Sequence, residues 1–161
     1  MRMIDGRLVV PEFMLRLAAN GIWPSERGNL ESQNLNPILA PESIRDWAPG
    51  ERTVYFYPLP QCTIQMLING GDRFWLSEHA APLGIDHTLA VAIGDFGLGS
   101  DAPLVLDYRR SAESPSVLRL QWGRAGNQWI KVADSFEEFV EITGLASAIP
   151  RFREQSGQPE R

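Results

Sequence analysis

The sequence is poor in the residues that build disulfides, metal centres and nucleic-acid surfaces. Its 161 residues include one cysteine, Cys62, one lysine, Lys131, and two histidines. A single cysteine cannot form an internal disulfide, so the chain suits a reducing compartment. The arginines are scattered and the formal net charge is −5, which argues against binding to nucleic acid. Signal-peptide and membrane-span patterns are both missing, so we expect a cytoplasmic protein without a membrane partner.

The two histidines and the cysteine do not indicate a catalytic or metal site. His79 and His87 lack the spacing of paired zinc ligands. Cys62 follows Pro60-Gln61 without a nucleophile signature, and an unpaired cysteine is most often a small buried residue. We therefore expect no cofactor, no metal and no catalytic residue.

A glycine-rich turn carries the most suggestive carboxylates. Asp95, Asp101 and Asp107 surround it, but their spacing does not match a calcium-binding loop. The glycines of the turn lack the Lys-Ser/Thr pair of a phosphate-binding loop. We interpret them as structural residues that shape the turn between two strands: Gly94, Gly97 and Gly99.

Period-two alternation of apolar residues dominates the second half of the chain. It predicts four strands joined by short polar turns, an antiparallel meander, at residues 89–93, 104–108, 117–122 and 128–132. A helix is predicted to follow, because Ser135 and Glu138 form a capping box. Phe136 and Phe139 begin its apolar stripe, and Gly144 ends it.

The first half is less regular. A strand is predicted at residues 53–57 and an edge strand at 8–10, with helices after Pro11 and over 42–47. Residues 63–68 and 73–76 are interpreted as a hairpin, with a helix over 60–69 as the alternative. The fold class is therefore α+β: an antiparallel sheet of about six strands with helices packed on it. One domain is expected over residues 1–150, followed by a polar, disordered tail at 151–161.

Aromatic residues divide into two expected groups. Trp122, Trp129 and Phe136 fit a hydrophobic core, whereas exposure is plausible for Trp75, Tyr55 and Tyr57. Exposed aromatic residues beside acidic groups are typical anchors of protein interfaces.

The order of these features resembles the SUKH superfamily. The resemblance covers residues 89–145 and rests on the run IGDFGLGSDAPLVLD from Ile93, a following strand pair, Trp129, and VADSFEEF from Val132. That family groups Smi/Knr-type fungal cell-wall regulators with bacterial proteins that neutralise polymorphic toxins. The resemblance implies a non-enzymatic protein-binding domain.

Our first hypothesis is an immunity protein that blocks a cognate toxin. Acidic loop residues would imitate the negative substrate of a basic toxin such as a nuclease, with aromatic residues beside them. The expected partner-binding residues are Asp95, Asp101, Glu113, Trp75 and Tyr57. Partner specificity is expected in the loops at residues 22–60 and 77–88.

Two alternatives remain open from sequence. One is a regulatory scaffold of the Smi/Knr type that binds host proteins. The other is a metal-dependent hydrolase that uses Asp95, Asp101 and His87.

Overall fold

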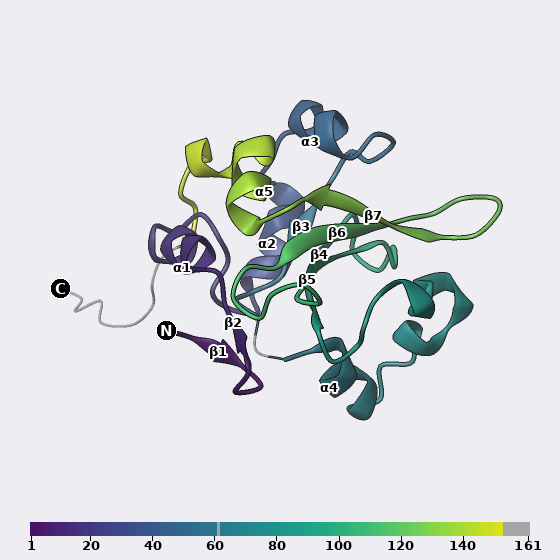
Figure 1. Cartoon of the computed structure of the whole chain (residues 1–161). Helices are drawn as coiled ribbons and strands as arrows, with labels where there is room; N and C mark the ends of the chain where they lie inside the picture. Colours follow the sequence, from purple (N-terminus) through teal and green to yellow (C-terminus); the bar gives the residue numbers. More distant parts are fainter. Residues whose placement is uncertain (61, 153–161) are drawn as a thin grey trace.

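The computed structural model describes residues 1–60 and 62–152, and it confirms the predicted α+β class (Figure 1). A five-stranded antiparallel sheet has the order β3-β4-β5-β6-β7, and a separate two-stranded hairpin is formed by β1 and β2. The predicted tail begins two residues too early, because Arg151 and Phe152 both donate backbone hydrogen bonds to the Gly21 carbonyl oxygen. The rest of the expected tail, residues 153–161, lies outside the described residues.

The predicted meander forms the body of the sheet. Its strands are β4 (Ala90–Asp95), β5 (Pro103–Asp107), β6 (Ser116–Gln121) and β7 (Gln128–Ala133). The short strand β3 (Tyr55–Phe56) pairs with the end of β4, where a Cβ atom on Gly94 would lie 2.7 Å from the Tyr55 carbonyl oxygen. A glycine at this position is therefore a requirement of the strand pairing.

The helix after the meander is α5 (Phe136–Thr143), as predicted. The Ser135 hydroxyl accepts a hydrogen bond from the Glu138 amide at 3.1 Å. The Glu138 carboxylate reaches one residue beyond the usual capping box and accepts from the Asp134 amide. Gly144 ends the helix with φ of 75°, the left-handed conformation that glycine adopts without steric cost.

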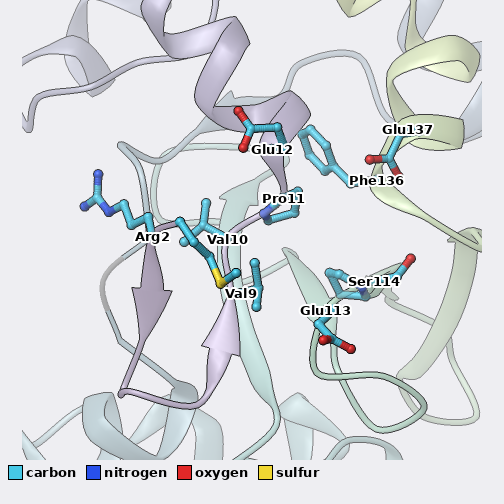
Figure 2. A pocket seen from close by; sticks show the side chains of 11 residues that line it. Arg2, Val9, Val10, Pro11, Glu12, Glu113, Ser114, Phe136 and Glu137 are labelled. Carbon is cyan, nitrogen blue, oxygen red and sulfur yellow. The ribbon is translucent and has the colours of Figure 1, made fainter.

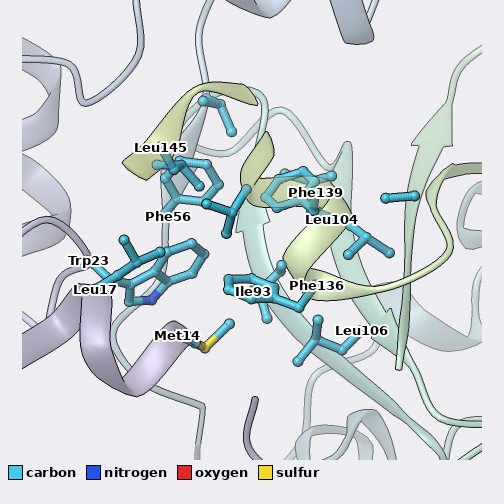
Figure 3. Close-up of a cluster of buried hydrophobic side chains, with 14 of the residues drawn as sticks. Met14, Leu17, Trp23, Phe56, Ile93, Leu104, Leu106, Phe136, Phe139 and Leu145 are labelled. Atoms are coloured by element: carbon cyan, nitrogen blue, oxygen red, sulfur yellow. The ribbon is translucent and has the colours of Figure 1, made fainter. Parts of the chain in front are cut away.

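One face of the sheet carries the large core, which we call the main face. Phe136 and Phe139 of α5 pack there against Trp23, Phe56 and strand residues such as Ile93 (Figure 3). Helices α1 (Glu12–Ala19) and α3 (Pro41–Trp47) contribute to the same core, as does the hairpin of β1 (Met3–Ile4) and β2 (Leu8–Val9).

The opposite face, the minor face, has a smaller core under short helices. It is covered by α4 (Ile64–Asn69) and the 3₁₀ turns η1 (Phe74–Leu76), η2 (Glu78–Ala80) and η3 (Pro82–Gly84). Trp75 stacks on Trp129 there, with ring centroids 6.3 Å apart. Figure 1 shows α4 on the side of the sheet away from α5. A fourth turn, η4 (Leu145–Ser147), follows α5.

The predicted hairpin over residues 63–76 is wrong, and its helical alternative is correct. Thr63 caps α4 by accepting a hydrogen bond from the Met66 amide at 3.3 Å. Ile64 then turns into the minor core, where it is fully buried. The composition of residues 63–68 favours a strand, but the Thr63 cap and the packing of Ile64 stabilise a helix instead.

Helix α2 (Asn29–Leu35) was not predicted, yet it closes one edge of the sheet. The side-chain amide of Gln33 donates to the Phe56 carbonyl oxygen at 2.9 Å and accepts from the Phe56 amide at 2.8 Å. Gln33 thus satisfies both backbone groups of Phe56, as a neighbouring strand would.

Candidate functional site

Four of the five expected partner-binding residues line one small hollow at an end of the sheet. Tyr57 follows β3, Asp95 ends β4, Asp101 precedes β5, and Trp75 lies in η1. Asp72, Phe74 and Pro103 complete the lining of a cavity of about 100 Å³. We call this the acidic hollow. It exists because antiparallel pairing places the end of β4 beside the start of β5, with Asp95 opposite Pro103.

Asp95 is buried and held in the turn by hydrogen bonds. One oxygen, Oδ1, accepts hydrogen bonds from the Gly97 amide at 2.9 Å and the Ser100 hydroxyl at 2.5 Å. These two bonds fix the position of the Asp95 side chain relative to the turn. Burial nevertheless raises the pKa of Asp95 above its ordinary value, and the nearby negative charge of Asp101 adds to this effect.

Asp101 and Asp72 supply the other two carboxylates. Asp101 is exposed and has φ of 55°, a left-handed conformation that aspartate and asparagine tolerate better than most residues. Within the described chain its carboxylate has no hydrogen-bond donor. Asp72 accepts from the Phe74 amide and from the indole nitrogen of Trp75, each at 3.2 Å.

Tyr57 lies among these three carboxylates. Its backbone is fixed from both sides, because its amide donates to the Ile93 carbonyl oxygen and its own carbonyl accepts from the Trp23 indole. Burial raises the pKa of the Tyr57 hydroxyl, and the negative charges of Asp95, Asp101 and Asp72 raise it further. The hydroxyl therefore stays protonated at neutral pH and can donate or accept a hydrogen bond.

The negative charge of the hollow is not neutralised by a neighbouring cation. The three ion pairs found among the described residues all lie elsewhere: Arg7 with Asp5, Arg109 with Asp107, and Lys131 with Asp134. The hollow is consequently a local concentration of negative charge with an aromatic wall.

A longer groove lies beside the hollow. It has a volume of about 730 Å³ and shares Tyr57 and Asp72 with the hollow. Its apolar lining comes from the segment after β3, from α4 and from β4: Pro58, Leu59, Pro60, Met66, Leu67 and Ala92. Arg27 and Ser25 also line it, as does Cys62, whose thiol pKa is raised by burial. Cys62 is thus held as a thiol, which is the less reactive form.

Two tryptophans lie in environments opposite to those expected from the sequence. Trp75, expected to be accessible, is only 4% exposed and serves as a wall of the hollow. Trp122, expected in the core, is 48% exposed and donates its indole N–H to the Asp101 carbonyl oxygen at 2.9 Å. Its ring stacks on His79 with centroids 5.4 Å apart. Tyr55 is also buried rather than exposed, and its hydroxyl donates to the Asn34 side chain.

Glu113 does not join the acidic hollow. It lies in the connection between β5 and β6, at the end of the sheet where Asp107 pairs with Ser116, away from Asp95 and Pro103. There it lines a separate pocket with Glu12 and Glu137, as Figure 2 shows. The structure therefore does not bring Glu113 together with Asp95 and Asp101.

The hydrolase alternative required His87 to meet Asp95 and Asp101. His87 instead precedes β4, and Asp95 ends it, so the length of the strand separates them. Over residues 1–60 and 62–152, no three His, Cys, Asp or Glu side chains are grouped as a metal site. The same residues include no helix that is long and apolar enough to cross a membrane.

Comparison with known proteins adds no relative. No family model matches the chain, and searches of curated proteins and of solved structures each find no match.

Proposed function

We propose that this chain is a non-enzymatic protein-binding domain of the cytoplasm that neutralises a basic toxin, in the manner of SUKH immunity proteins. The observation that carries the proposal is the convergence of Asp72, Asp95 and Asp101 around Tyr57. Such a surface complements a protein whose active site is positively charged, for example a nuclease.

The surface around the hollow offers features that protein interfaces use. Trp122 exposes a large aromatic ring beside Asp101, and tryptophan is among the residues that contribute most to interface affinity. The carboxylates of Asp72 and Asp95 are fixed by hydrogen bonds, so little ordering of these two groups is needed on binding. Covering a toxin's active site would then combine steric exclusion with electrostatic attraction.

The test is binding and neutralisation of the product of the gene encoded immediately beside this one. We expect one-to-one binding in calorimetric titration, loss of the partner's toxicity, and an affinity that falls as salt rises. Asp101→Asn should weaken binding by about tenfold, the effect of losing roughly 1.4 kcal/mol of interaction.

Glu113→Gln is the matched control, because it removes the same charge at the other end of the sheet. Equal weakening by both variants would show that only net charge matters. If the purified neighbour does not bind at all, toxin neutralisation is refuted, and host proteins become the partners to examine.

A further inference from the structure

We infer that the groove and the acidic hollow together hold a segment of the partner in which an apolar residue is next to an arginine. This inference rests on the proposed function and specifies the partner's chemistry. The arginine side chain enters the hollow, and the apolar side chain lies on the lining formed by Leu59, Met66 and Leu67.

The size and chemistry of the hollow favour a guanidinium group. A cavity of about 100 Å³ accommodates the end of one side chain but not a second strand or helix. Its walls are Tyr57 and Trp75 together with Phe74, and its negative charge comes from three carboxylates. A planar cation can lie against an aromatic ring while its edge donates to carboxylates, which is the geometry that arginine provides.

Acceptor atoms remain for several donors. Oδ1 of Asp95 already accepts two hydrogen bonds in the turn, and the Ala102 amide is a further donor to this buried carboxylate. Within the described chain no donor is found for the carboxylate of Asp101 or for the hydroxyl of Tyr57. Arginine has five N–H donors in a fixed plane and lysine has three on one atom, so several separated acceptors favour arginine.

The groove determines what accompanies the arginine. It shares Tyr57 and Asp72 with the hollow, and about half of its lining is apolar, including Met66, which is 43% exposed. Methionine adapts its shape to different apolar side chains. Arg27 lines the groove but not the hollow, so a second positive charge on the segment is disfavoured there.

The probe is acetyl-Leu-Arg-amide, and its matched control is acetyl-Leu-citrulline-amide, which has nearly the same shape without the charge. Both are titrated into the full ¹⁵N-labelled chain and followed by two-dimensional NMR. We expect saturable shifts at Tyr57, Asp72, Asp101 and the Trp75 indole, with binding of the citrulline peptide weaker by about tenfold or more. Asp101→Asn should reduce binding of the arginine peptide, while Glu113→Gln should not.

Equal binding of the two peptides, or shifts centred on the Glu113 pocket, would overturn the inference. An absence of saturable shifts at the hollow would overturn it as well. A binding measurement with the neighbouring gene product distinguishes this outcome from failure of the proposed function. If the neighbour binds and is neutralised while the arginine peptide does not bind, only the recognition mode is wrong. If the arginine peptide binds at the hollow while the neighbour does not, only toxin neutralisation is wrong.

Discussion

The two faces of the sheet differ in the size of the hydrophobic cores that they bury. The main face buries the phenylalanines of α5, the tryptophans Trp23 and Trp47, and the N-terminal hairpin in one large core. The minor face has a much smaller core under a six-residue helix and three 3₁₀ turns, and the groove and the acidic hollow open beside it. Short elements with few buried contacts open more easily than a large core, so binding residues on this face can adjust without unfolding the sheet.

The largest expected effect tests the main face. Phe139→Ala removes a fully buried ring that contacts Trp47, Phe56 and Phe136, and we expect a loss of about 3–5 kcal/mol in the free energy of unfolding. Urea denaturation measures this loss. A loss below about 1 kcal/mol would mean that the main face does not dominate stability.

A smaller and more local effect is expected on the minor face. Ile64→Ala truncates a fully buried residue at the start of α4 and should cost about 2 kcal/mol, the low end for such changes. Because α4 and the 3₁₀ turns can open separately, hydrogen exchange should accelerate in α4 more than in β5. Equal acceleration in both elements would show that the two faces unfold as one unit, contrary to the comparison.

The smallest expected effect concerns the charge of the hollow. Burial raises the pKa of Asp95 in the folded chain. The contribution of Asp95 to the free energy of unfolding is therefore fully present below the unfolded-state pKa, and it is lost as pH rises through the folded-state pKa. Asp95→Asn is neutral throughout and can still accept the turn hydrogen bonds. Its stability relative to the natural chain should therefore rise between pH 3 and pH 7.

Thermal unfolding of the two proteins across this pH range measures the difference. Glu113→Gln, at the other end of the sheet, removes one carboxylate in the same way and serves as the control. A relative stability of Asp95→Asn that falls with rising pH would contradict the assignment of a raised pKa. The expected rise would mean that the chain keeps an ionised carboxylate at some cost to folding.

Sequence patterns predicted the main face well because its signals are local. Alternation over β5 and β6 and the Ser135 cap of α5 act within a few residues, and the structure contains both. Helix α2 could not be predicted in this way. Its sequence is polar and has no apolar stripe, and its main role is the contact of Gln33 with Phe56, 23 positions away.

The candidate site was predictable in its residue types but not in its arrangement. Asp95, Asp101 and Tyr57 were identified because they are carboxylates and an aromatic residue at the ends of predicted strands. The part played by Asp72 was missed, since the segment around it was interpreted as a hairpin turn. The exposures of Trp75 and Trp122 depend on which 3₁₀ turn covers which strand, and no short sequence pattern specifies that packing.

The contact between Gln33 and Phe56 also limits how the sheet can grow. An uncovered strand edge offers amide and carbonyl groups to any passing extended chain, and this is how many proteins begin to aggregate. At β3 one glutamine side chain occupies both groups of Phe56. At the opposite edge the chain's single lysine, Lys131, lies within β7, and charged lysines on edge strands discourage such pairing. We therefore expect these two side chains, one at each edge, to oppose pairing of the sheet with other chains.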